Sequence, residues 1–148
     1  WGEILKNLVT LRLPVVSARN EFEACRYLAE QGIRAPVVAA YGARGWSPAR
    51  RESFIVCDAL EGFTSLEDLA AGWEAAPPTP LQKRRLVMGV ARFARAFHGV
   101  GMIHRDFYIC HLLAEQAAWA AGRVELAVLD LHRARIFRRI PTRWLARD

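Results

Sequence analysis

The sequence predicts an α+β domain with a smaller first lobe and a mainly helical second lobe. Segments with helical periodicity and segments with strand-like alternation occur together, and the chain contains no internal repeat. Prolines at positions 77, 78 and 80 interrupt the pattern, so we expect a lobe of residues 1–76 and another of residues 77–148. The 148 residues are 53% apolar and 24% charged, which is sufficient for a buried core and excludes a disordered tail.

The first 76 residues are expected to contain both helices and strands. Pro14 ends the first helix, and Gly32 stands where a C-terminal cap closes the second. Apolar runs favour two strands, which a loop at residues 42–51 joins. In chain order we predict a helix at 1–13, a helix at 18–31, strands at 36–41 and 53–57, and a short helix at 65–71 that ends near Gly72.

The longest predicted helix begins after Pro80, and we interpret its apolar stripe as core. Beyond this helix a polar cluster follows Ile103, and a loop through Gly122 leads to a strand at 124–129. Asp130 follows the end of that strand. The stripe consists of Leu81, Leu86, Val87, Val90, Phe93, Ala94 and Phe97.

The formal charge of +6 is distributed unevenly. Residues 131–148 hold six arginines and one acid, Asp148, so this segment carries +5 and the rest of the chain +1. Such a segment suits phosphates, an anionic membrane surface or nucleic acid, with a solvated helix face as the alternative. Since no nucleic-acid recognition motif accompanies it, we expect no nucleic-acid partner.

Composition also indicates where the protein works. No apolar run approaches the roughly 20 residues that a membrane-spanning helix needs. The three cysteines, Cys25, Cys57 and Cys110, are an odd number and lie far apart, which favours a reducing cytosol and not a disulfide framework. The chain begins at Trp1, and we expect it to be a piece of a longer protein.

Two aspartates in a histidine-rich region carry the predicted chemistry. Asp106 can orient an acceptor hydroxyl and take its proton, and His111 can reach the same pocket. Asp130, at a strand end, can hold a divalent metal ion. Phosphoryl transfer needs such a set, because positioning and charge neutralisation do most of the work. All four histidines fall within 35 residues: His98, His104, His111 and His132.

The same region resembles known kinases. His104-Arg105-Asp106 resembles the protein-kinase catalytic loop, and Asp130 resembles the aspartate of the Asp-Phe-Gly metal motif. His111 replaces the usual asparagine, and Leu131-His132 replace Phe-Gly. With these departures, residues 104–113 and 129–134 closely resemble the lipopolysaccharide core heptose kinases, as do residues 18–21 and 1–4. The resemblance covers essentially the whole chain.

The resemblance implies a protein-kinase-like fold with a partial N-lobe and a catalytic C-lobe. Asp106 corresponds to the catalytic base, accompanied by His104 and Arg105. Asp130 corresponds to the Mg²⁺ ligand, and His111 to a second metal-side or phosphate-side group. His132 is left without a settled role.

For ATP binding, the resemblance implies Glu21 as the helix glutamate that pairs with a nucleotide-binding lysine, with Glu23 as a competitor. Residues 58–62 resemble the hinge that receives adenine, which makes Asp58, Ala59 and Leu60 candidate ATP contacts. No Gly-x-Gly-x-x-Gly run occurs, and Lys6 lies in a helical pattern. We therefore expect the phosphate loop and the lysine strand to precede Trp1.

The expected activity is ATP- and Mg²⁺-dependent phosphorylation of a heptose hydroxyl of the lipopolysaccharide inner core. The resemblance places it in the cytoplasm, at the inner face of the inner membrane, where residues 131–148 would meet an anionic acceptor and an anionic membrane surface. Two alternatives stay open. One is a kinase of another small hydroxylated acceptor, such as a sugar or an aminoglycoside. The other is a catalytically silent kinase-like module that binds nucleotide.

Overall fold

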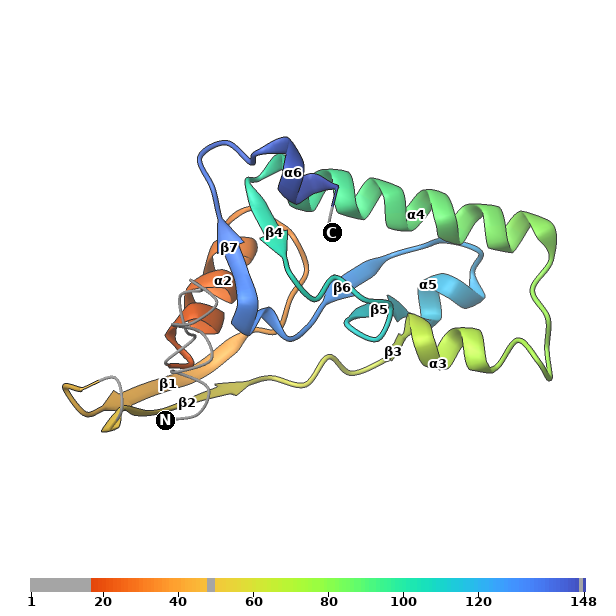
Figure 1. The fold of residues 1–148 in the computed structure, drawn as a ribbon. Coiled ribbons are helices and arrows are strands. Elements are labelled where there is room, and N and C mark those ends of the chain that lie inside the picture. The colour runs from red at the N-terminus through yellow and green to blue at the C-terminus, as the bar shows by residue number, and fades with distance from the viewer. Residues whose placement is uncertain (1–16, 48–49, 147) are drawn as a thin grey trace.

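A computed structural model describes residues 17–47, 50–146 and 148. The helix predicted at residues 1–13 lies outside the described residues, as do Lys6 and Arg147. The elements are α2 (Arg19–Glu30), β1 (Val38–Arg44), β2 (Glu52–Cys57), β3 (Phe63–Ser65), α3 (Leu66–Ala71), α4 (Pro80–Gly99), β4 (Met102–His104), β5 (Leu112–Glu115), α5 (Gln116–Ala120), β6 (Leu126–Val128), the 3₁₀ helix η2 (Leu131–Arg133), β7 (Ala134–Ile136) and α6 (Thr142–Leu145) (Figure 1).

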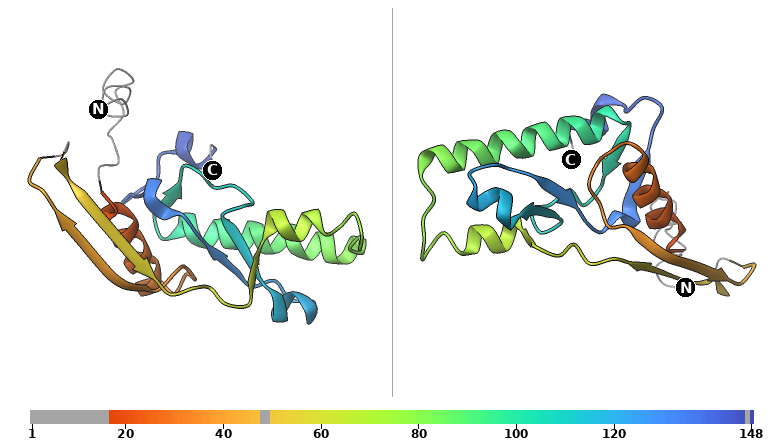
Figure 2. Two further views of the ribbon diagram at one scale, coloured as in Figure 1. Left: turned by 90° about the horizontal axis from the view of Figure 1, so that it is seen from below. Right: turned by 180° about the vertical axis from the view of Figure 1, so that it is seen from behind.

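Helix α2 packs on the antiparallel hairpin of β1 and β2 (Figure 2). The ring of Phe22 stacks on that of Tyr41 with centroids 4.8 Å apart, and Ser53 Oγ accepts the N–H of Ala18 at 2.9 Å. β1 extends three residues beyond the predicted strand, because Arg44 still pairs with Glu52 across the hairpin. The loop predicted at residues 42–51 is correspondingly shorter.

Two small sheets follow the hairpin along the chain. β5 lies between β3 and β6 and is antiparallel to both, while β4 pairs with β7. Helix α4 runs alongside these strands, and α6 lies near its C-terminal end (Figure 1). The N-terminus of α4 carries a capping box between Thr79 and Gln82, with Pro80 in the first turn.

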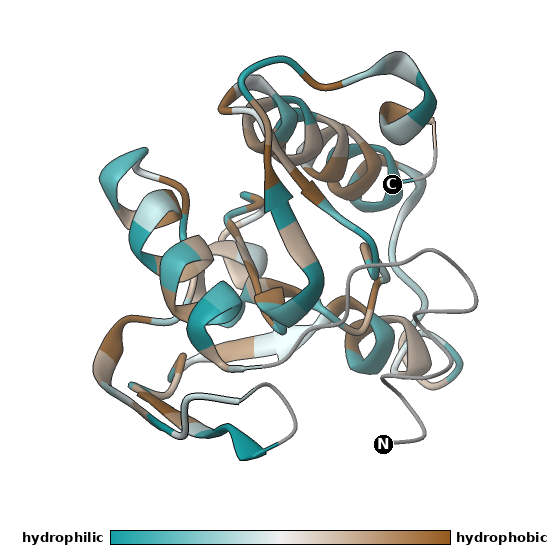
Figure 3. Cartoon of the chain, turned by 60° about the vertical axis from the view of Figure 1, so that its left-hand side comes forward, coloured by the Kyte–Doolittle hydropathy of each residue, from teal (hydrophilic) through white to brown (hydrophobic). Residues whose placement is uncertain are grey.

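The packed face of α4 is narrower than the predicted stripe. Leu86 and Phe97 are buried, but Leu81 is 56% exposed and Val87 is 66% exposed. Val87 lies about 100° around the helix from the neighbouring Leu86, and only Leu86 is covered. Figure 3 shows hydrophobic and hydrophilic residues following each other along the turns of this helix.

One core joins the first and second halves of the chain. Buried residues of α2 and α3 share it with residues of α4 and of strands β4 to β7. The division into lobes 1–76 and 77–148 stays a prediction. In the described part of the chain, no helix combines the length and apolarity needed to cross a bilayer. The core comprises Ala24, Cys25, Leu28, Leu66, Leu86, Phe97, Met102, Leu112, Ala114, Leu126, Val128, Leu131 and Ala134.

Gly101 fixes the start of the β4–β7 ladder, which leads to the polar cluster. Its φ is +81°, and a Cβ there would collide with the carbonyl oxygen of Phe137. We expect Gly101→Ala to lower the free energy of unfolding of the full-length protein by about 2 kcal/mol or more. Gly99→Ala is the control, since a Cβ at Gly99 meets open space. Urea denaturation compares the two, and equal midpoints would contradict the expectation.

Candidate active site

His104, at the end of β4, is completely buried beneath the loop that follows it. Its Nε2–H donates to the carbonyl oxygen of Leu129 at 3.0 Å, and its Nδ1 accepts the N–H of Asp106 at 3.1 Å. These two bonds require a neutral ring with the proton on Nε2. Burial lowers the pKa of His104, and the nearby His111 lowers it further. The imidazole therefore supports the loop.

Asp106 follows in a tight turn, with its carboxylate largely shielded from solvent. Its Oδ1 accepts a hydrogen bond from Arg133 at 2.8 Å, and its carbonyl oxygen accepts from His111 Nδ1 at 2.8 Å. Arg133 thus orients the predicted base, a role that the sequence pattern did not assign to it. Its place in the Asp-Leu-His-Arg run at 130–133 is the signal that could have identified it. Arg105 is half-buried in the same loop.

Asp130 lies two residues beyond the end of β6, which is shorter than the strand predicted at 124–129, and has φ +58° and ψ +52°. Left-handed backbone is unfavourable for a residue with a Cβ and persists only where the surroundings hold it. The carboxylate lies between two imidazoles: His111 Nε2 is 3.4 Å from Oδ2, and His132 Nδ1 contacts Oδ1. His111 therefore bridges the turn of Asp106 and the carboxylate of Asp130.

The first turn of α2 holds the segment after Asp130. The side-chain amide of Asn20 donates to the carbonyl oxygens of His132 at 2.7 Å and Ala134 at 3.0 Å. The backbone of Leu131 lies near Glu21 and acts to lower the pKa of its carboxyl group. Helix α2 and the loop of Asp130 are consequently fixed to each other.

Glu21 is the glutamate that faces the site. Burial raises its pKa, and the nearby charge of Asp130 raises it further. Glu23 instead forms a 2.7 Å ion pair with Arg19 on the exposed side of the helix. Within residues 17–47, 50–146 and 148, no arginine or lysine forms an ion pair with Glu21, and Lys6 lies outside these residues.

Asp148 is a site residue that the sequence pattern missed. Its carboxylate is only 1% exposed, and Oδ2 accepts the backbone N–H of His104 at 2.7 Å. The same oxygen lies 3.2 Å from Nε2 of His98, a histidine without a predicted function. The one acid of the basic segment thus anchors the start of the loop that carries Asp106. Its isolation among arginines was the available signal.

The predicted hinge lies in the extended connection between β2 and β3. Asp58 donates its N–H to Val37 at 2.9 Å, and the carbonyl oxygen of Leu60 accepts from Phe63 at 3.4 Å. In the described structure this leaves the N–H groups of Ala59 and Leu60 without a backbone partner. Backbone groups of this kind could bind adenine.

The donor set around Asp130 is compatible with Mg²⁺. This ion is usually held by one or two carboxylates and the substrate phosphates, and keeps several waters. Asp130 offers a carboxylate that is 42% exposed. No group of three or more His, Cys, Asp or Glu side chains within the described residues could enclose a metal. Imidazole suits Mg²⁺ poorly, so Asp130 is the better ligand, and the metal-side role of His111 stays a prediction.

Comparison with known proteins places these features in a family. Residues 1–148 match the sequence model of the lipopolysaccharide kinase (Kdo/WaaP) family. The chain belongs to this family. Both the expected family and the α+β, kinase-like fold class are confirmed. The Kdo/WaaP membership extends over every element described above.

Curated relatives carry the same name in two organisms. The Pseudomonas aeruginosa lipopolysaccharide core heptose(I) kinase WaaP is 46% identical over 149 residues, which cover 100% of this chain and 56% of that protein. The Escherichia coli protein of that name is 40% identical over 147 residues, covering 99% and 56%. A solved structure, WaaP in complex with acyl carrier protein, superposes with a TM-score of 0.77 at 42% identity, covering 88% of this chain and 55% of that one. The chain thus spans about half the length of these Kdo/WaaP relatives.

Substitution of Asn20 tests the link between α2 and the loop of Asp130. Asn20→Ala removes the donor from two backbone carbonyl oxygens, and we expect the full-length protein to lose about 1–3 kcal/mol of unfolding free energy. The adjacent Arg19→Ala removes only an exposed ion pair and should cost less than about 1 kcal/mol. Urea denaturation measures both, and an equal loss would show that the amide does not fasten the loop.

The burial of His104 predicts a pH dependence of stability. Its pKa lies below the ordinary 6.5 in the folded protein, so the unfolded chain binds the proton more readily. Stability from this group is complete above pH 6.5 and is lost as the pH falls below it. Urea midpoints at about pH 7.5 and about pH 5.5 should therefore differ more for the full-length wild type than for His104→Gln. Glu21 remains in both proteins, so its raised pKa does not affect the comparison. Equal pH dependence would contradict the assignment.

Proposed function

We propose that the protein containing this chain is an ATP-dependent kinase that phosphorylates a hydroxyl of heptose in the lipopolysaccharide inner core. The observation that carries the proposal is the placement of Asp106 and Asp130 on adjoining loops that His111 bridges. Membership of the Kdo/WaaP family and the names of its relatives support the substrate.

In this mechanism Asp106 accepts the proton of the attacking hydroxyl. Arg133 holds the carboxylate in one orientation, and the hydrogen bond between His104 and the N–H of Asp106 fixes the position of the turn. Asp130 would hold Mg²⁺, which would supply charge neutralisation at the phosphates. The fixed positions of the two carboxylates supply the alignment on which phosphoryl transfer depends.

ATP binding is assigned to Glu21 and the predicted hinge, both in the first half of the chain. The N–H groups of Ala59 and Leu60 are available to adenine, and Glu21 would pair with a lysine on a strand before Trp1. A full-length protein without such a lysine would contradict this part of the proposal.

We place the enzyme in the cytoplasm, at the inner face of the inner membrane. The support is the excess of arginine in residues 131–148, which favours contact with an anionic acceptor or an anionic leaflet. Nucleic acid is not proposed as a partner.

A second candidate is a nucleotide-binding module without turnover. The observation in its favour is that both oxygens of the Asp130 carboxylate lie next to imidazoles, in place of the usual Phe-Gly and asparagine. A kinase of another small hydroxylated acceptor differs from the main proposal only in its substrate, which an acceptor screen decides.

Asp106→Ala tests the reaction directly. The full-length protein is incubated with ATP, Mg²⁺ and under-phosphorylated lipopolysaccharide core, and mass spectrometry detects the added phosphoryl group. We expect wild type to add one group and Asp106→Ala to be slower by about 10²–10⁴-fold, the usual contribution of a general base. Glu67→Ala, an exposed position on α3, is the control and should match wild type.

The negative outcomes are also informative. If neither wild type nor Asp106→Ala transfers phosphate but both bind ATP, another acceptor replaces heptose in the proposal. If wild type binds ATP and transfers phosphate to none of the screened acceptors, the silent module is favoured. Full activity of Asp106→Ala would exclude this residue as the base.

A further inference from the structure

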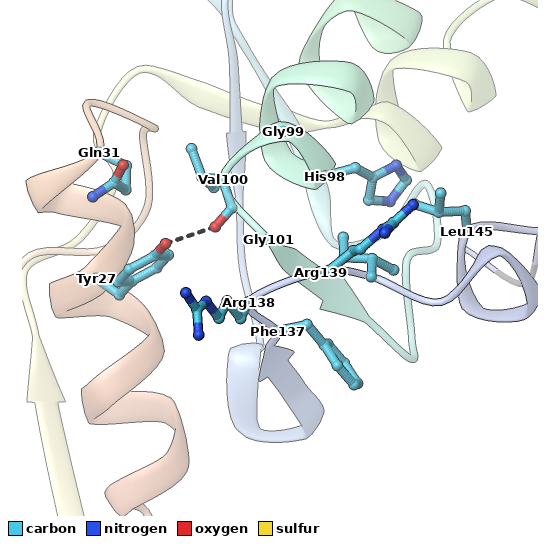
Figure 4. Close-up of a pocket in the computed structure, with 11 residues that line it drawn as sticks. Tyr27, Gln31, His98, Gly99, Val100, Gly101, Phe137, Arg138, Arg139 and Leu145 are labelled. Atoms are coloured by element: carbon cyan, nitrogen blue, oxygen red, sulfur yellow. Dashed lines mark hydrogen bonds between the residues drawn. The ribbon is translucent and has the colours of Figure 1, made fainter.

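A cavity of about 650 Å³ lies where the C-terminal ends of α2 and α4 meet the segment that follows β7 (Figure 4). It is within the size range of ligand sites in proteins. Gln31, just after α2, lines it together with His98 of α4 and Leu145 of α6. Arg138 and Arg139 contribute from the segment after β7. None of these residues is assigned to the reaction centre.

The cavity carries positive charge that the described residues do not neutralise. Neither Arg138 nor Arg139 forms an ion pair within the described part of the chain, and no acid lines the wall. The nearby Asp148 carboxylate is 1% exposed and already bonded to His98 and to the backbone of His104. The two guanidinium groups are therefore available to an anion from outside the described structure.

A second cavity, of about 430 Å³, shows what a neutralised basic cavity looks like in this protein. Its wall contains Arg34 and Arg92, but Arg34 is paired with Glu115 at 3.1 Å, and Glu125 lies in the same wall. The contrast indicates that the absence of acids beside Arg138 and Arg139 is a property of that cavity and not of all grooves on the molecule.

The two arginines flank the cavity instead of converging on one point. In Figure 4, Arg138 extends toward Tyr27 on α2, whereas Arg139 extends toward His98 and Leu145. The Tyr27 hydroxyl donates to the carbonyl oxygen of Val100 at 2.6 Å and so belongs to the wall. A guanidinium binds carboxylate or phosphate through two parallel hydrogen bonds. The arrangement suits an extended ligand with separated acidic groups better than a single small anion.

We propose that this cavity binds an acidic part of the saccharide acceptor, whose separated carboxylate or phosphate groups are remote from the hydroxyl that reacts. The inference rests on the proposed function and deepens it. Gly101 lines the cavity, and five residues on lies Asp106, at most about 17 Å away along an extended chain. One oligosaccharide can therefore place a hydroxyl at Asp106 and separate acidic groups beside Arg138 and Arg139.

The test compares two double variants of the full-length protein with the same change of charge. Arg138→Ala with Arg139→Ala removes the cavity's guanidinium groups, and Arg84→Ala with Arg95→Ala removes two exposed arginines of α4. Calorimetry without ATP measures binding of deacylated, under-phosphorylated lipopolysaccharide core. We expect the cavity variant to raise Kd by about tenfold or more, since each guanidinium contributes charge-assisted hydrogen bonds. The control variant should change Kd less than about twofold, and the Kd for ATP should be unchanged in both.

Binding of phosphatidylglycerol-containing vesicles is measured alongside. Three results would overturn the site: equally weaker core binding in both variants, unchanged core binding in both, or a cavity variant that loses binding only to the vesicles. The last would assign Arg138 and Arg139 to the membrane surface. Failure of the proposed function is distinguishable. A wild type that binds the core through these arginines but transfers no phosphate keeps the site and loses the reaction. A wild type that transfers phosphate although the cavity variant binds the core normally keeps the reaction and loses the site.

Discussion

The geometry of the site depends on the buried, neutral imidazole of His104. One ring nitrogen holds the amide of Asp106, and the other holds the carbonyl of Leu129, the residue before Asp130. A single side chain thereby sets the spacing of both aspartates. Because the ring is excluded from water and both nitrogens are hydrogen-bonded, its orientation is fixed. The loop of Asp106 and the end of β6 are thus joined through one side chain.

A second constraint connects this unit to α2. Asp130 adopts left-handed backbone, which costs roughly 1–3 kcal/mol for such a residue. The Asn20 amide holds the following segment through the carbonyl oxygens of His132 and Ala134 and offsets that cost. The helix that is expected to contact the nucleotide side is consequently coupled to the aspartate that is expected to hold the metal. A displacement of α2 would release the strained turn.

Short-range sequence patterns predicted the parts of the site that lie close together in the chain. The periodicity of residues 18–31 and of the segment after Pro80 located both long helices, and the strand before Asp130 placed that aspartate at a strand end. Strands β3, β4, β5 and β7 and the short helices α5, η2 and α6 were not predicted, because elements of three to five residues contain too little of a period to detect.

Contacts between distant residues escaped the sequence analysis for a different reason. Arg133 meets Asp106 across 27 residues, and Asp148 meets His104 across 44. Nothing in local composition specifies such partners, since tertiary packing selects them. The exposure of Val87 has the same origin: periodicity gives the width of an apolar stripe, whereas the neighbouring strands decide how much of it is covered.

The anchoring of His104 by Asp148 also bears on how the protein is made. During synthesis the chain emerges from its N-terminus, and β4, β5, β6 and β7 are all available before residue 148. Until that residue leaves the ribosome, the amide of His104 lacks its acceptor and His98 lacks its carboxylate. The nascent chain can thus complete its strands before the backbone of His104 is anchored. The order of translation makes this anchor one of the last contacts of the region to form.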